Sequence, residues 1–237
     1  MSKRKRRTNR LDSQIDELTA GAPDKRGVTV IGNDIVEQAT LVVTIRKTPI
    51  MWGIPCDELG YSKFWIHFER HANRMPWDAF AGSEGTYLRR ARNSIHNAFI
   101  DSDLPYLMML DSDILFPPNI ADKLMAYNLP IVGGWYRDKN SPDHHPVVYD
   151  YAEESEDGIS NWHHRTVPGK GLERVGGMGA GCWLLSRDTA VALGKDPYGT
   201  NLGGGEDMIF SRKLIELGIP LHMDWNINCA HVGVSFV

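Results

Sequence analysis

The chain has 237 residues, of which 42% are hydrophobic, and its formal net charge is −4 at pH 7. These values are typical of a soluble globular protein with one large core, and they exclude a chain that is strongly basic or acidic as a whole. No segment approaches the ~18 consecutive apolar residues of a membrane span, so we expect a cytoplasmic protein. Cys56, Cys182 and Cys229 are widely spaced without a CxxC pair, which argues against a disulfide framework or a structural zinc site.

The amino terminus is the exception to this balanced charge. Residues 2–10 carry six positive charges in nine positions and contain no apolar residue. We interpret residues 1–35 as a basic, disordered tail and lead-in, and residues 36–237 as a single domain. A tail of this kind either binds nucleic acid or another anionic surface, or only keeps the chain in solution.

Predicted strands and helices alternate along the rest of the chain. Strands are expected where short β-branched or apolar runs are bounded by Gly, Pro or polar residues, at 39–46, 77–81, 107–110, 129–134 and 219–224. Helices are expected where apolar residues recur at helical spacing, at 61–74, 86–100, 117–125, 188–193 and 208–217. This alternation predicts an α/β fold with a mostly parallel central sheet flanked by helices. The segment 135–174 is irregular, with short β-like pieces at 146–149 and 172–175.

The main candidate site is the run LMMLDSDILF at 107–116, in which two acids interrupt an apolar strand. Open α/β sheets bind their ligands at the carboxyl ends of strands, where Asp111 and Asp113 fall. Alternate residues of an extended strand face the same side, so both carboxylates are expected to address one divalent cation such as Mg²⁺ or Mn²⁺. The alternative is a polar turn in which Asp113 only caps the next helix.

Two glycine-rich stretches are further candidates. Residues 176–181 precede an apolar run and offer close backbone approach and N–H groups to a phosphate, or else form a tight turn into a strand. Residues 203–205 are three glycines before Glu206 and Asp207, which places these acids at the mouth of the cleft. Capping by the helix dipole explains one of the two acids without any ligand.

Taken in order, the runs LMMLDSDILFPP, GMGAGCWLLSRD, GGGEDMIFSRKLIELGI and CAHVG resemble the GT-A family of nucleotide-sugar-dependent glycosyltransferases, over about residues 41–233. The resemblance implies the GT-A fold and makes Asp111, Ser112 and Asp113 the DxD motif. It implies that Asp113 binds Mn²⁺ or Mg²⁺ directly, that Asp111 lies nearer the donor's ribose or a metal-bound water, and that His231 completes the metal site.

The resemblance also implies the remaining site residues. Asp207, or else Glu206, matches the acid that serves inverting members as general base. The donor-binding side is expected to include residues from the first strand, the arginine-rich helix and the glycine stretch at 176–181, namely Thr44, Arg46, Arg92, Gly179, Ala180 and Gly181. The implied activity is a metal-dependent, inverting transfer of sugar from a nucleotide-diphosphate donor, a UDP-sugar, to an acceptor hydroxyl. Segment 135–174 matches no acceptor pattern.

The acceptor and two other function classes remain open. One hypothesis is a hydroxylated DNA base docked by the basic tail, as in phage DNA modification, in which case the cytoplasm is that of the host. The others are a saccharide, a lipid-linked sugar or a protein side chain. A metal-dependent nucleotidyltransferase and a non-catalytic nucleotide-sugar binder are the alternatives from different classes.

Overall fold

The computed structural model describes residues 46–56, 61–83, 87–139, 143–154, 160–199 and 205–232. The chain divides into two compact units, residues 1–47 and residues 48–237. Only Arg46 and Lys47 of the first unit are described, so the basic tail, the predicted boundary at 35/36 and nearly all of the predicted strand at 39–46 lie outside the described residues. All helices and strands among the described residues belong to the second unit.

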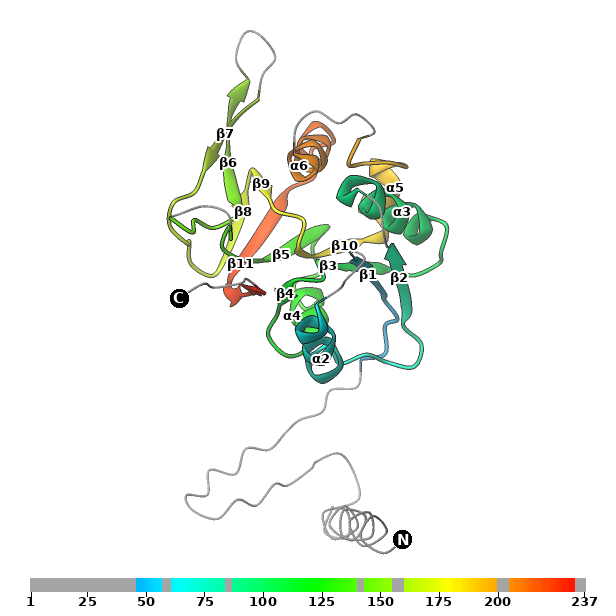
Figure 1. Cartoon of the computed structure of the whole chain (residues 1–237). Coiled ribbons are helices and arrows are strands. Elements are labelled where there is room, and N and C mark those ends of the chain that lie inside the picture. Colours follow the sequence, from blue (N-terminus) through cyan, green and yellow to red (C-terminus); the bar gives the residue numbers. More distant parts are fainter. Residues whose placement is uncertain are drawn as a thin grey trace, which may run out of the picture. The chain divides into compact units, whose positions relative to one another are not determined.

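A seven-stranded mixed sheet forms the centre of the second unit, with the strand order β2-β1-β3-β10-β5-β11-β8 (Figure 1). Its strands are β1 (Met51–Pro55), β2 (Ala79–Ser83), β3 (Tyr106–Leu110), β5 (Ile131–Trp135), β8 (Leu172–Val175), β10 (Cys182–Ser186) and β11 (Leu221–Asn228). Five of them run in one direction, while β10 and β8 run against their neighbours. The predicted α/β class with a mostly parallel sheet is therefore confirmed.

Both faces of the sheet are buried, as the apolar run of β3 requires. Leu107 and Met109 join one hydrophobic cluster, and Met108 and Leu110 join the other, because successive side chains of a strand point to opposite faces. The helices are α2 (Ser62–His71), α3 (Leu88–Ile100), α4 (Ile120–Met125), α5 (Arg187–Leu193) and α6 (Glu206–Glu216). Helices α3, α5 and α6 pack into the first cluster, and α2 and α4 into the second (Figure 1).

Two small sheets complete the fold. Strands β6 (Val148–Glu154), β7 (Ser160–His164) and β9 (Gly177–Met178) form one, and the β6–β7 hairpin projects from the body in Figure 1. Strands β4 (Ile114–Leu115) and β12 (Ala230–His231) form the other, with His231 opposite Ile114. The segment predicted as irregular thus contains this hairpin, and its two β-like pieces fall in β6 and β8.

Strand β1 was not predicted, although all five of its residues are buried. Its sequence Met-Trp-Gly-Ile-Pro lacks the alternation and β-branching of a typical strand, and glycine is normally unfavourable there. Gly53 is needed because α3 lies close: a Cβ at this position would stand 2.5 Å from Cγ2 of Ile95. The strand is therefore stabilised here by close packing of a helix and not by the strand propensity of its own residues.

Candidate functional site

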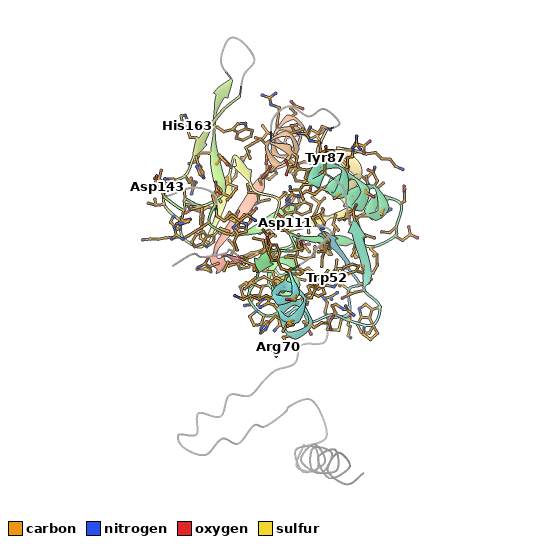
Figure 2. The ribbon with its side chains drawn as sticks, in the orientation of Figure 1. Trp52, Arg70, Tyr87, Asp111, Asp143 and His163 are labelled. Carbon is orange, nitrogen blue, oxygen red and sulfur yellow. The ribbon has the colours of Figure 1, made fainter. Side chains whose placement is uncertain are left out.

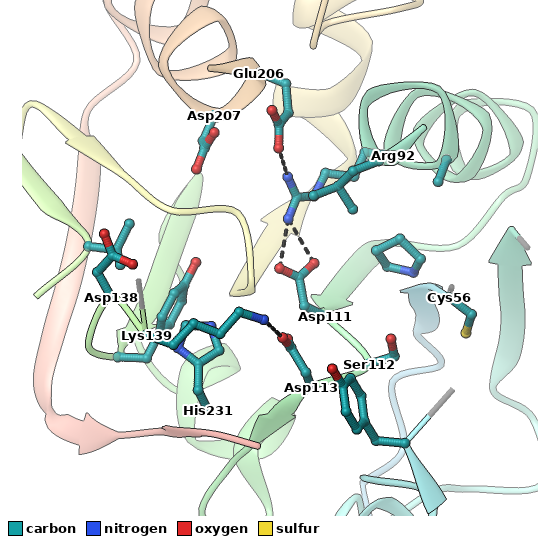
Figure 3. Close-up of a pocket in the computed structure, with 16 residues that line it drawn as sticks. Cys56, Arg92, Asp111, Ser112, Asp113, Asp138, Lys139, Glu206, Asp207 and His231 are labelled. Atoms are coloured by element: carbon teal, nitrogen blue, oxygen red, sulfur yellow. Dashed lines mark hydrogen bonds and ion pairs between the residues drawn. The ribbon is translucent and has the colours of Figure 1, made fainter. Parts of the chain in front are cut away.

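A cavity of about 520 Å³ opens at the carboxyl ends of the parallel strands β1, β3 and β5 (Figure 3). Its lining comes from these strand ends, from α3, from the start of α6 and from β12, and comprises Pro55, Cys56, Tyr61, Leu88, Ala91, Arg92, Asp111, Ser112, Asp113, Tyr136, Asp138, Lys139, Val147, Glu206, Asp207 and His231. This position and size are those of ligand sites in open α/β sheets. Figure 2 shows Asp111 in the interior of the unit, between the two helix layers.

The Asp-Ser-Asp sequence forms a turn and not the continuation of the strand. Strand β3 ends at Leu110, and the Ile114 N–H donates to the Asp111 carbonyl at 3.0 Å, which closes the turn. The expectation that Asp111 and Asp113 lie on one face of an extended strand is therefore wrong. The two carboxylates have different partners, because the turn directs one toward Arg92 of α3 and the other toward Lys139, which follows β5 (Figure 3).

Arg92 of α3 connects the strand end to α6. Its side chain is only 2% exposed, its Nη2 donates to both carboxylate oxygens of Asp111 at 2.8 and 2.7 Å, and its Nη1 donates to Glu206. Burial opposes its charge, but Asp111, Asp207 and Glu206 together raise the pKa of Arg92 above its ordinary value. The guanidinium is a permanent cation, and its planar geometry suits the two-oxygen contact.

The neighbouring Asn93 holds the segment before α6 against α3. Its side-chain amide donates to the carbonyl of Gly199 at 2.9 Å and its oxygen accepts from the Tyr198 N–H at 3.0 Å. The Tyr198 ring stacks on Phe210 of α6, with ring centroids 4.7 Å apart. Helix α6 is thereby fixed to α3 on both sides of its start, which positions its first two residues over the cavity.

Asp207 stands beside Glu206 in the first turn of α6, and its carboxylate points into the cavity (Figure 3). The ion pairs of Arg92 go to Asp111 and Glu206, so Asp207 is not held by them. Burial raises the pKa of the Asp207 carboxyl; Arg92 lowers it in part, and the charges of Glu206 and Asp111 raise it further. A carboxylate with a raised pKa in a cavity suits proton abstraction.

Asp113, Lys139 and His231 meet on the opposite side of the cavity. The Val232 N–H donates to the Asp113 carbonyl at 2.6 Å, which together with the β4–β12 pairing holds residues 230–232 against the turn. His231 Nδ1 lies 2.7 Å from the carbonyl oxygen of Arg137 and must donate to it, which in the neutral imidazole leaves Nε2 as an acceptor. The ammonium of Lys139 forms an ion pair with the Asp113 carboxylate.

These residues suit a divalent cation only in part. The described residues contain no group of three or more His, Cys, Asp or Glu side chains arranged to hold a metal ion. Asp113 and His231 offer one oxygen and one nitrogen donor, whereas the Asp111 carboxylate is held by Arg92. Mg²⁺ and related hard ions often take only one or two protein ligands and complete their shell with water and substrate phosphates. The donors fit a metal that arrives with a phosphate ligand.

The glycine loop lies directly behind this site without lining the cavity. Gly179, Ala180 and Gly181 are buried, and the Gly181 N–H donates to the Tyr136 hydroxyl at 2.9 Å while its carbonyl accepts from the Asp111 N–H at 2.9 Å. A Cβ at Gly179 would run into the Tyr136 hydroxyl and stand 2.8 Å from Val147. The loop therefore supports the Asp111 turn directly through the Gly181 carbonyl, and Tyr136 holds the loop in place.

Several predicted residues are placed elsewhere, and several cavity residues were missed. Thr44 lies outside the described residues and Arg46 belongs to the unit 1–47, so their contact with a donor stays a prediction. Sequence reasoning missed Tyr136, Asp138 and Lys139. The signal available for them was their position, because they follow the predicted strand at 129–134 and so leave the same edge of the sheet as Asp111.

Comparison with solved structures identifies the fold. The chain is similar to A197 from STIV, with 16% identity, a TM-score of 0.56, and 78% of this chain and 86% of that chain covered. It is also similar to GalNAc-T7, solved with UDP, GalNAc and Mn²⁺, with 15% identity and a TM-score of 0.54. That match covers 78% of this chain and 43% of GalNAc-T7, so the chain spans less than half of that relative.

No family model matches the sequence, and no curated protein matches it either. At these identities the structural likeness establishes the fold alone, and the fold is of the GT-A type that the sequence resemblance predicted. Within the described part of the chain, none of the helices has both the length and the apolar character needed to cross a membrane.

Proposed function

We propose that the chain is a glycosyltransferase that moves a sugar from a nucleoside-diphosphate donor to an acceptor hydroxyl. The observation that carries this proposal is the convergence of the Asp-Ser-Asp turn, the two acids of α6 and His231 on one cavity at the carboxyl edge of a GT-A sheet. These groups come from three distant parts of the sequence. They meet at the carboxyl edge of the sheet, where α/β folds bind ligands. This favours one binding site over the alternative that each group only caps a helix or forms a turn.

Each side of the cavity has a distinct task in this proposal. Asp207 accepts the proton of the attacking hydroxyl, and its raised pKa brings it closer to the working range of a general base. Arg92 keeps Asp111 and Glu206 fixed, so that the base and the strand end hold a constant geometry. A direct attack of this kind inverts the configuration at the anomeric carbon of the transferred sugar, as the sequence resemblance implies.

The donor side lies around Asp113. A metal held by Asp113 and His231 would supply Lewis-acid stabilisation of the departing diphosphate. The neighbour GalNAc-T7, solved with UDP, GalNAc and Mn²⁺, supports a UDP-sugar and Mn²⁺ or Mg²⁺ as the first choices. Ser112, only 8% exposed at the middle of the turn, lines the same side and is proposed to contact the donor.

The test is release of UDP from a panel of UDP-sugars by the purified chain, with Mn²⁺ present, followed by binding and turnover of three variants. Asp207→Asn is expected to reduce turnover about 10²–10⁴-fold, while UDP binding persists. Glu206→Gln tests the second candidate base. Asp188→Asn makes the same chemical change in the first turn of α5, outside the cavity, and should leave turnover unchanged. Normal turnover by the Asp207 variant would reject the assignment of the base.

The same assay separates the alternatives. A nucleotidyltransferase would consume a nucleoside triphosphate and release pyrophosphate, and a non-catalytic binder would retain UDP-sugar without releasing UDP. For the acceptor, a hydroxylated DNA base and simple saccharides, lipid-linked sugars or protein side chains are to be compared directly. Because the basic residues 2–10 lie outside the described residues, the DNA hypothesis is tested by salt-dependent binding of duplex DNA before and after their deletion.

A further inference from the structure

The two acids of the Asp-Ser-Asp turn are each paired with a cation from the protein itself, and the two pairs differ in character. Arg92 is buried and joins Asp111 through two hydrogen bonds, so this pair is a fixed part of the fold. Lys139 is 39% exposed and forms an ion pair with Asp113, whose side chain is 14% exposed. Displacing a partly exposed ammonium costs far less than displacing a buried guanidinium.

Lys139 reaches Asp113 from the segment that follows β5. Its ammonium occupies the position beside the Asp113 carboxylate that a bound metal ion would take. His231, the other donor on this side, is fixed through the carbonyl of Arg137, two residues before Lys139. Burial opposes the charge of Lys139, but its hydrogen bond to Asp113 and the charges of Asp113, Tyr61 and Asp111 raise its pKa, so the side chain is an ammonium. A metal ion and this ammonium compete for the same carboxylate.

The formal charges of the cavity favour the entry of a further cation. Its lining contains five acids, Asp111, Asp113, Asp138, Glu206 and Asp207, against Arg92 and Lys139. Negative charges therefore exceed positive ones by three, and an anionic diphosphate would be repelled unless positive charge came with it. A diphosphate also offers the Lys139 ammonium a new anionic partner, and it offers a metal the oxygen ligands that the protein does not supply.

We propose that Lys139 occupies the metal's position on Asp113 and leaves it when a nucleoside diphosphate arrives with a divalent cation, so that metal and nucleotide bind as a coupled pair. This inference rests on the proposed function. In the free protein Lys139 blocks metal binding at Asp113. With the nucleotide bound, the ammonium moves to phosphate oxygens, and the freed Asp113 would hold the metal together with His231. The coupling is reciprocal, so the metal must tighten nucleotide binding by the same factor.

The test is calorimetric titration of Mn²⁺ alone into the full chain, without nucleotide. Lys139→Met keeps the length of the side chain and removes the charge, and it is expected to bind Mn²⁺ about tenfold more tightly than the wild type, which corresponds to ~1.4 kcal/mol. Lys195→Met is the matched control, because Lys195 also pairs with a single carboxylate, that of Asp101, at 3.2 Å on the surface. Adding Asp113→Asn to Lys139→Met should abolish the gain, because Asp113 is the released ligand.

A second titration adds saturating UDP. UDP is expected to raise the Mn²⁺ affinity of the wild type more than that of Lys139→Met, because the variant has no ammonium to displace. Equal or weaker Mn²⁺ binding by Lys139→Met in the absence of UDP overturns the inference and leaves the UDP-sugar assay to decide the proposed function by itself. Tighter binding by Lys139→Met combined with no effect of UDP on either protein overturns the coupling, and with it nucleotide binding at this site.

Discussion

Arg92→Met is the substitution that most directly tests how the cavity is held together. Three hydrogen bonds join the guanidinium to Asp111 and Glu206, whose side chains are 17% and 20% exposed. Methionine fills the space of the aliphatic stem but leaves these two carboxylates without their cation. Breaking a buried ion pair in this way costs about 3–5 kcal/mol, and because both carboxylates keep some contact with the cavity we expect about 3 kcal/mol.

The measurement is the free energy of unfolding from urea titrations. Arg90→Met, an exposed arginine on the same helix, is the control and should change stability by no more than about 0.5 kcal/mol. Arg92→Lys keeps the charge and loses the planar geometry, so its cost should lie between the two. Adding Glu206→Gln to Arg92→Met should recover part of the loss, because one uncompensated carboxylate is removed. If Arg92→Met lowered the free energy of unfolding by less than about 1 kcal/mol, the Arg92 ion pairs would contribute no more than surface ion pairs do. The inference that they hold the cavity together would then be refuted.

Three further outcomes follow from the same geometry. Because burial raises the pKa of Asp207 in the folded chain, its ionisation opposes folding above its ordinary pKa; Asp207→Asn should therefore be more stable than the wild type at pH 7, and urea unfolding at pH 3 should show no such gain. Gly179→Ala should cost about 1–3 kcal/mol of unfolding free energy by pushing its methyl into the Tyr136 hydroxyl, whereas Gly194→Ala in open space would lose only through its positive φ of 70°. His231→Gln should leave UDP binding in EDTA unchanged while reducing the enhancement of binding by Mn²⁺ about tenfold or more, and an unchanged Mn²⁺ effect would remove this residue from the metal site.

The sequence predicted those elements whose own residues determine their form. The apolar run of β3 and the helical spacing of apolar residues in α3 predicted both elements with errors of one or two residues. The predicted stripe of Leu88, Ala91, Ile95 and Ala98 was right only for Ala91 and Ile95, because Leu88 and Ala98 are exposed and Phe99 is the buried residue of the last turn. Strand β1 was missed because its stability comes from packing against α3 at Gly53, a contact between segments about 40 residues apart in sequence. Tertiary packing overrides local propensity in such cases.

The candidate site shows the same division. The acids Asp111, Asp113, Glu206 and Asp207 were recognisable because a carboxylate next to a buried strand or a glycine run is costly unless a ligand, a cap or an ion pair compensates its charge. Their partners were not recognisable, since the ion pair between Lys139 and Asp113 joins residues 26 apart in sequence through two strand ends. Lys139 stands in a stretch of Pro, Asp and His that has no periodicity. Its role in the cavity follows only from its position after β5, which places it beside Asp113.

The turn after β3 gives its two acids separate roles, and this separation has a mechanistic consequence. Asp111 is bound through Arg92 to the helix that carries Asp207, so a movement of α6 would be transmitted to Asp207, the proposed base, and to the strand end together. Asp113 is bound instead to the exposed Lys139 and, through its carbonyl, to the chain segment of His231, so the donor side is able to exchange partners while the base side stays fixed. The proposed transfer reaction needs this combination, because its donor would enter and its diphosphate would leave on each cycle, whereas the proposed base would return to the same geometry every time.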